Sequence, residues 1–317
     1  MTDREPDDFI FGGDDFSNPI GSGSSTALPL DQPTEIIPPR EDRREDFNQP
    51  TIEVAHRTEH HQAPGLLDGL RLAVTTFTVV PFKSGPIDRR TARIAMGLAP
   101  YIGLALGVAI GGIAIGLRAG HSPALLTGLV CVGVLAALTR GLHLDGLADT
   151  VDGLGSYRSR EQTLAVMKSP EVGAFGVVAL ILSVGIPAVC IATLSTRPWW
   201  SVLAAVAAAC ACGRLAAAFA CRRGVPAASS TGLGATVAET TGAVELALGV
   251  VVTAVVAIFA VPHRSWQGPV AVFVGLAATI ALVAHATRRL GGITGDVLGA
   301  CVEIATAVTV AGMVLGN

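Results

Sequence analysis

Long apolar blocks, separated by short polar connections, fill the chain from about residue 94 onward. The first block, Ile94–Leu117, contains no charged residue over 24 positions. A helix that spans a bilayer needs about 20 apolar residues, with roughly 17–25 tolerated. The blocks are too long for barrel strands and do not alternate in polarity. They predict seven spanning helices, at Ile94–Leu117, Ser122–Leu138, Val172–Leu194, Pro198–Cys221, Val244–Val261, Pro269–Ala286 and Val297–Leu315.

An eighth apolar segment, Leu66–Phe82, differs from these because it contains Asp68 and Arg71. The two charges favour a re-entrant or interfacial position over a span. The expected fold is therefore an all-α, polytopic helical membrane protein with seven or eight membrane segments and cytoplasmic acidic loops. Composition agrees, since 50% of the residues are hydrophobic and only 15% are charged. A soluble all-helical core would need too much polar covering for seven such blocks.

The first 65 residues differ in kind from the rest. They hold 14 acidic and 5 basic residues, together with many Pro, Ser and Gly. Such a segment buries too little apolar surface to offset its ordering entropy, so we expect residues 1–65 to form a disordered acidic tail. No basic stretch followed by an apolar one is present, so the tail is not a signal peptide. Residues 66–317 form the membrane-embedded domain.

Basic residues between the blocks predict the orientation of the chain. If the segment before Ile94 is cytoplasmic, twelve basic residues fall in inside connections and three in outside ones. Lys and Arg concentrate in cytoplasmic loops of membrane proteins. We therefore expect a multi-pass protein of the cell membrane, with its long polar connections and its active site facing the cytoplasm.

Three aspartates occur at helical spacing in the stretch "LHLDGLADTVDGLG", residues 142–155. Asp145, Asp149 and Asp152 are spaced i, i+4 and i+7, which places them on one face of a helix. Carboxylates this close repel one another unless a cation is present. Mg²⁺ takes oxygen ligands and commonly shares its shell with substrate phosphates. We expect all three to bind Mg²⁺ and to be catalytic, with His143 as a base or as a residue that orients a ligand.

Basic residues surround this acidic motif. They are Arg140, Arg158, Arg160 and Lys168. Guanidinium and ammonium groups bind phosphate oxygens through charge-assisted hydrogen bonds. The four residues therefore indicate an anionic substrate, and no nucleic acid is expected as a partner.

A second candidate site lies in "RRLGGITGDVLGACVEIA", residues 288–305. Gly291, Gly292 and Gly295 predict a loop that opens a helix and whose N–H groups can bind phosphate. Asp296 and Glu303 share a face of that helix, and Glu303 falls inside an apolar block, where a carboxylate is usually functional. We expect Asp296 to complete the metal or diphosphate site, with Glu303 supporting it, so the two motifs must be neighbours in space.

Structural alternatives stand beside each of these expectations. The aspartates can belong to a capped turn with solvated acids. Gly291–Gly295 can be a tight turn, and Glu303 can pair with Arg214, the one basic residue deep in a late block. The sequence alone leaves both alternatives open.

Four stretches resemble the cobalamin synthase family, the adenosylcobinamide-GDP ribazoletransferases. "LHLDGLADTVDGLG" is similar to the family signature and "GGITGDVLGACVE" (291–303) to its final motif. "FTVVPF" (77–82) and "MKSPEVGAFG" (167–176) match two further segments in the same order. The resemblance spans about residues 66–317. One departure is that Ser169, Pro170 and Glu171 stand where the family has Asp-Ser-Arg, so another cation, such as Arg158, Arg160 or Lys168, must replace that Arg if it binds phosphate.

The resemblance implies a transferase of cobalamin biosynthesis. A hydroxyl of α-ribazole, or of its 5′-phosphate, would attack the phosphoryl group of adenosylcobinamide-GDP, and GMP would leave. Mg²⁺ is the implied cofactor, and membrane lipid surrounds the protein. A different membrane phosphotransferase, acting on a nucleotide-activated alcohol, and a secondary transporter are the alternatives. The sequence does not determine whether the chain forms a homo-oligomer.

Overall fold

The structure, a computed structural model, describes residues 65–82 and 87–316. The chain divides into two units, Met1–Thr58 and Glu59–Asn317, and every described residue belongs to the second. The expectation of a disordered acidic tail falls on residues 1–64, which lie outside the described residues, and stays a prediction.

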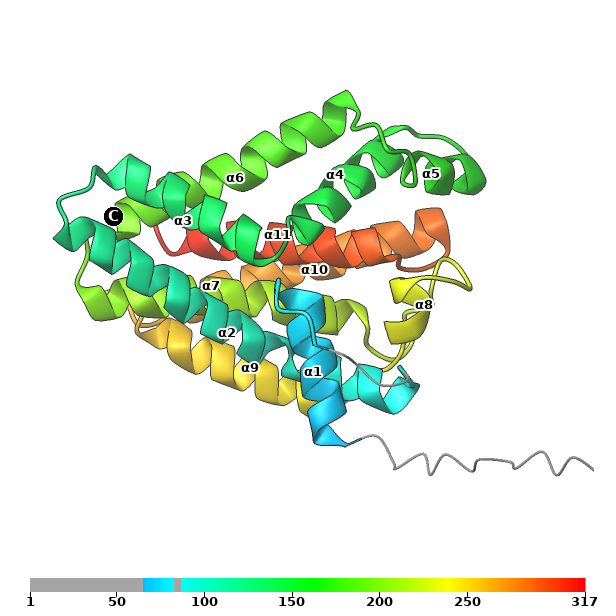
Figure 1. Ribbon diagram of the computed structural model, residues 1–317, viewed down its shortest axis with the longest axis horizontal. Helices are drawn as coiled ribbons and strands as arrows, with labels where there is room; N and C mark the ends of the chain where they lie inside the picture. The colour runs from blue at the N-terminus through cyan, green and yellow to red at the C-terminus, as the bar shows by residue number, and fades with distance from the viewer. Residues whose placement is uncertain (1–64, 83–86, 317) are drawn as a thin grey trace, which may run out of the picture. The chain divides into compact units, whose positions relative to one another are not determined.

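The described residues form an all-helical unit without β-strands, as Figure 1 shows. This confirms the predicted all-α class. The helices are α1 (Leu66–Phe77), α2 (Arg89–Ala119), α3 (Ala124–Leu138), α4 (Leu142–Gly155), α5 (Arg160–Val166), α6 (Ala174–Leu194), α7 (Trp199–Ala220), α8 (Leu233–Val237), α9 (Ala243–Ile258), α10 (Gln267–Leu290) and α11 (Gly295–Gly312).

Five helices are long and apolar enough to cross a membrane: α2, α6, α7, α10 and α11. Helices α3 and α4 would together make a sixth, but they are bent by 92° at the break between them. Helix α9 is apolar and has 16 residues. The five or six candidate spans support a multi-pass membrane protein.

The break between α3 and α4 has a local cause in the backbone. Arg140 and Gly141 both adopt left-handed conformations, with φ of 56° and 65°. Two consecutive left-handed residues cannot continue a right-handed helix. The chain therefore turns at this point, and α4 leaves the direction of α3.

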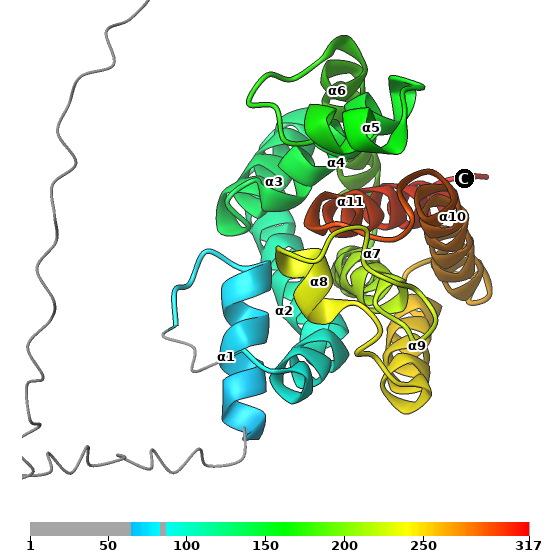
Figure 2. The same cartoon turned by 90° about the vertical axis from the view of Figure 1, so that its right-hand side faces the viewer.

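Helix α7 lies at the centre of the bundle, with α2, α9, α10 and α11 around it (Figure 2). Its sequence is rich in Ala, and most of its residues are buried. Gly103 and Gly107 of α2 allow that helix to approach the α7 backbone at Cys210 and Ala207. Small residues stabilise helix pairs in membranes in this way, because they let two backbones come into contact.

Helix α1 crosses the bundle instead of running along it. In Figures 1 and 2 it lies across α2, roughly perpendicular to the long helices. It has 12 residues, so its length of about 18 Å is too short for the hydrocarbon core of a bilayer, about 30 Å. Leu66–Phe82 is therefore not an eighth span by itself.

Candidate functional site

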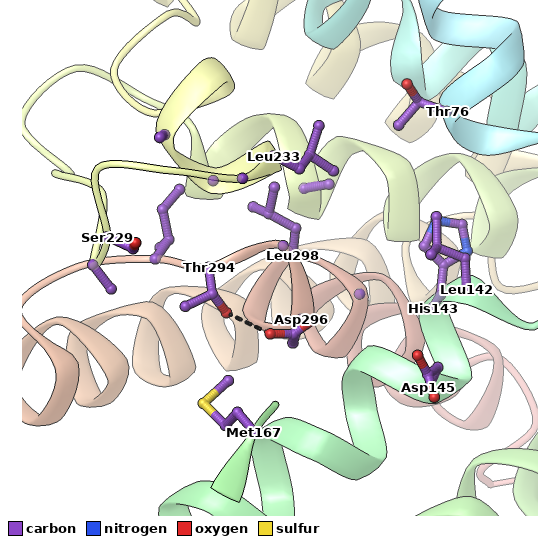
Figure 3. A pocket seen from close by; sticks show the side chains of 18 of the residues that line it. Thr76, Leu142, His143, Asp145, Met167, Ser229, Leu233, Thr294, Asp296 and Leu298 are labelled. Atoms are coloured by element: carbon purple, nitrogen blue, oxygen red, sulfur yellow. Dashed lines mark hydrogen bonds between the residues drawn. The ribbon is translucent and has the colours of Figure 1, made fainter. Parts of the chain in front are cut away.

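A cavity of about 420 Å³ opens at the end of the bundle where α2 begins. Seven helices contribute to its wall: α1, α2, α4, α5, α7, α8 and α11. Figure 3 shows His143 and Asp145 on one side of it and Thr294 and Asp296 on another. The lining is mainly apolar, with polar groups from α1, α4, the residues just after α5, the segment around α8, and the start of α11.

The two acidic motifs meet at a crossing of α4 and α11. A methyl group at Gly146 would lie 2.8 Å from the backbone oxygen of Asp296, and one at Gly299 would lie 3.0 Å from that of His143. Only residues without a side chain allow the helices to come this close. The prediction that the first motif and the last apolar block are neighbours is confirmed, across about 150 positions of sequence.

Two of the predicted acidic residues line the cavity, and a third lies beside them. Asp145 is exposed and Asp296 half-buried, and both belong to the cavity wall. Asp296 accepts a hydrogen bond from the Thr294 hydroxyl, at 3.2 Å. Partial burial, followed by the nearby charges of Asp145, Asp296 and Asp152, raises the pKa of Asp149 to about 6. Asp145, Asp296 and Asp152 are thus close enough to Asp149 for their charges to act on its carboxylate.

Asp152 has a clear structural contact. Its two carboxylate oxygens accept hydrogen bonds from the backbone N–H groups of Gly173 and Gly176, at 2.7 and 2.8 Å. These groups lie at the first turn of α6, where backbone donors have no partner within the helix. Asp152 therefore caps α6 from a neighbouring helix, a role that its spacing in the sequence does not reveal.

Metal binding is constrained by this arrangement. Among the described residues, no group of three or more His, Cys, Asp or Glu side chains is placed to hold a metal ion. Asp145 and Asp296 still interact electrostatically across the cavity. Mg²⁺ is commonly bound by one or two carboxylates, with water and substrate phosphates completing its shell. The donor set fits a cation held jointly with an anionic substrate, and it does not form an all-protein cage.

His143 lies at the start of α4 and lines the cavity. Its side chain is buried, its ring stacks on Phe77 with centroids 5.9 Å apart, and Nδ1 has no hydrogen-bond partner. A buried imidazole nitrogen without a partner is uncommon. Burial, followed by the nearby charge of Arg214, lowers the pKa of His143 to about 3, so the imidazole is neutral.

Only one of the four predicted basic residues lines the cavity. Lys168 does so, and its charge acts on Asp296. Arg160 donates a hydrogen bond to the carbonyl of Ala228 at 2.8 Å, and Arg140 to that of Thr75 at 3.2 Å. Arg158 contributes its backbone carbonyl, which accepts from Arg289 at 3.1 Å. These three residues connect the loops around the cavity.

The glycine-rich loop is divided between structure and site. Gly291 ends α10 with a left-handed φ of 79°, and the Gly292 backbone packs tightly on that of Pro226 and Ala227. The N–H of Ile293 already donates to the Pro226 carbonyl, at 2.9 Å. Of the three glycines, only Gly295, the first residue of α11, lines the cavity. The left-handed turn therefore accounts for Gly291, and tight backbone packing accounts for Gly292.

Glu303 points away from the cavity wall. Its carboxylate accepts a hydrogen bond from Ser183 of α6, at 3.0 Å. Glu303 and Arg214 make no direct ion-pair contact in the described part of the chain, but the charge of Arg214 still acts on the Glu303 carboxylate, so the alternative of a structural pair stays open. Arg214 is 1% exposed and its Nε has no hydrogen-bond partner.

Sequence reasoning missed one wall of the cavity, the segment around α8. Its lining residues are Ala228, Ser229, Thr231, Gly232, Leu233, Gly234 and Ala235. The pattern showed only a polar connection there. The pairing of Ala227 with Ile293, which brings this segment to the start of α11, is a long-range contact with no local pattern.

Comparison with known proteins gives a consistent result. The sequence model of a family described as cobalamin-5-phosphate synthase matches residues 69–314. A protein of a Nocardioides species, named adenosylcobinamide-GDP ribazoletransferase, is 40% identical over 243 residues, which cover 76% of this chain and 96% of that protein. One of the same name from Frankia casuarinae is 39% identical, over 75% of this chain and 91% of its own. No solved structure matches.

Proposed function

The chain belongs to the cobalamin-5-phosphate synthase family, and we propose that it acts as an adenosylcobinamide-GDP ribazoletransferase. It joins α-ribazole, or α-ribazole 5′-phosphate, to adenosylcobinamide-GDP and releases GMP. The product is adenosylcobalamin or its 5′-phosphate. The alternatives, a phosphotransferase for another nucleotide-activated alcohol and a secondary transporter, are not favoured by the family match.

One observation carries the assignment to this cavity. Asp145 and Asp296, from motifs at opposite ends of the membrane domain, line the same wall because α4 and α11 cross at Gly146. Phosphoryl transfer depends on positioning and charge neutralisation more than on covalent chemistry. A cavity whose lining is mainly apolar and includes carboxylates and a lysine suits the diphosphate part of a large substrate.

Mg²⁺ is the proposed cofactor. Asp145 and Asp296 would hold it, with Asp149 beside them and Asp152 contributing through its charge. When bound, Mg²⁺ neutralises the diphosphate and stabilises the leaving phosphate. This proposal is supported by the position of Asp145 and Asp296 in one cavity and by the negative charges that act on Asp149 beside them, which a cation would relieve.

We propose that two side chains of the protein, His143 and Lys168, contact the substrates during the reaction. The hydroxyl of the ribazole forms a new bond to the phosphorus on the corrinoid side, and the P–O bond to GMP breaks. His143, whose pKa is lowered to about 3 by burial and by the nearby charge of Arg214, orients the hydroxyl while the hydroxyl proton passes to water, and Lys168 donates to phosphate oxygens. The positions of His143 and Lys168 on the cavity wall support these roles.

The proposed topology has seven membrane segments, α2, α3, α6, α7, α9, α10 and α11, which correspond to the seven apolar blocks. The cavity lies at the end where these helices meet the connections richest in Arg and Lys. This supports an active site that faces the cytoplasm of a protein in the plasma membrane.

The decisive experiment measures GMP release from adenosylcobinamide-GDP by the protein in liposomes, with α-ribazole or α-ribazole 5′-phosphate as the second substrate. We expect stoichiometric GMP and a nucleotide-containing corrinoid product. Movement of either substrate into the vesicles without GMP release would favour a transporter instead.

A further inference from the structure

Helix α1 presents an apolar face that no described residue covers. Leu66, Leu67 and Leu70 are 68%, 65% and 40% exposed. The side of the helix that packs on α2, with Gly69, Leu72, Ala73 and Phe77, is buried. A water-soluble surface rarely presents three large aliphatic side chains within five positions, so this face requires a partner.

The place where α1 crosses α2 indicates its depth. A methyl group at Gly69 would clash with the side chain of Ile94, and Leu72 and Ala73 pack in one cluster with Ala95. The charged first turn of α2 ends at Arg93, and its uncharged stretch begins at Ile94. Helix α1 therefore lies at the level where α2 passes from polar to apolar surroundings.

The direction of α1 agrees with this depth. It runs across the long helices in both views (Figures 1 and 2), so it lies parallel to a membrane that those helices cross. Asp68 and Arg71 form an ion pair at 3.3 Å on the helix. Beyond its end, Val79, Val80 and Phe82 are also more than 40% exposed. Apolar side chains are thus exposed at both ends of α1.

We propose that α1 is an interfacial helix whose outer face lies in membrane lipid, at the boundary between headgroups and acyl chains. Leu66, Leu67 and Leu70 enter the acyl chains, and the charged tips of Asp68 and Arg71 stay at headgroup level. Amphipathic helices bind membranes in this plane, with their apolar face about 5–10 Å inside the boundary. The partner is lipid and not a second copy of the chain, because the exposed face lies at the same level as the start of the spans.

This placement joins the lipid boundary to the cavity. The last turn of α1 supplies Thr76 and Phe77 to the cavity wall, and Phe77 stacks on His143. Arg140 at the α3–α4 break donates to the Thr75 carbonyl, and the N–H of Val79 donates to that of Leu138. Lipid that holds α1 at a fixed depth therefore also fixes one side of the cavity.

A spin label at Leu67→Cys, in the full chain in liposomes, tests the proposal without an activity assay. The six native cysteines are buried, so a label reports mainly the introduced position, and the unsubstituted protein gives the background. Ile181→Cys on α6 is the matched lipid control and Tyr157→Cys the matched water control, since their side chains are 65% and 84% exposed.

We expect the label at Leu67 to resemble the one at Ile181, with greater access to molecular oxygen than to a water-soluble nickel chelate. Access like that at Tyr157 would place α1 in water and overturn the proposal. Low access to both reagents would mean that protein covers this face, such as a second copy of the chain, and would overturn it equally.

Discussion

Two helix crossings in this protein use the same packing device for different ends. Where α2 meets α7, Gly103 and Gly107 bring the backbones of two apolar helices into contact. Where α4 meets α11, Gly146 and Gly299 do the same, but the neighbouring positions carry His143 and Asp296. The first crossing stabilises the bundle, and the second also positions charged groups at a cavity. Close packing alone therefore does not mark a site; the polar residues beside it do.

The distinction between the two crossings would fail if the charge at the second crossing had no effect on turnover. Asp296→Asn keeps the shape of the residue and removes its charge. We expect turnover to fall by about a thousand-fold or more, because a charge that acts mainly on the transition state is lost. The melting temperature should change little. Near-normal GMP release from this variant would remove Asp296 from the site.

Gly146→Ala tests the geometry of the same crossing. The added methyl group would meet the Asp296 backbone at 2.8 Å and push α4 away from α11. We expect turnover to fall by about 100-fold, since a displacement of about 1 Å can cost that much, together with some loss of thermal stability. Turnover per folded molecule is the quantity to measure, and an unchanged value would contradict the account.

Gly103→Ala is the matched change at the first crossing. The methyl group would clash with the backbone of Cys210 and Ala211. Overpacking of this kind costs about 1–3 kcal/mol of stability. We expect a lower melting temperature in detergent, with turnover per folded molecule within a few-fold of the unsubstituted protein. A loss of turnover as large as in Gly146→Ala would erase the distinction between the two crossings.

Asp152→Asn should give the smallest effect. One of its two acceptor oxygens becomes an amide donor, so one hydrogen bond to the α6 backbone is lost. Loss of a helix-capping contact costs about 1 kcal/mol. We expect slightly lower thermal stability and a modest fall in turnover. If the fall matches that of Asp296→Asn, Asp152 acts directly at the metal and not mainly through α6.

The sequence located the long helices well, because uninterrupted apolar blocks are a property of local composition. It also predicted that Asp145 and Asp296 would meet, on the basis of two motifs expected on the same side of the membrane. It could not predict the contact of Asp152 with Gly173 and Gly176, since spacing shows which face of a helix a residue occupies and not what that face meets. The α8 wall was missed for the same reason.

The break between α3 and α4 at Arg140 and Gly141 also could not be predicted from the pattern of apolar and polar residues. A glycine that follows an arginine is compatible with many conformations, and the left-handed φ values depend on how α4 packs against α6 and α11. Likewise, Asp68 and Arg71 indicated that Leu66–Phe82 is re-entrant or interfacial, but its crossing of α2 was not predicted. Tertiary contacts decide such features, and the sequence carries them only indirectly.

The central claim is that Asp145 and Asp296 act as one unit on a metal-bound diphosphate. The most direct measurement is the Mg²⁺ dependence of turnover for Asp145→Asn, Asp296→Asn and the double variant. Residues that act as a unit are strongly non-additive. We expect the double variant to be hardly slower than the slower of the two single variants. We also expect both single variants to need more Mg²⁺ for half-maximal turnover. Multiplicative losses, with an unchanged Mg²⁺ requirement, would contradict it.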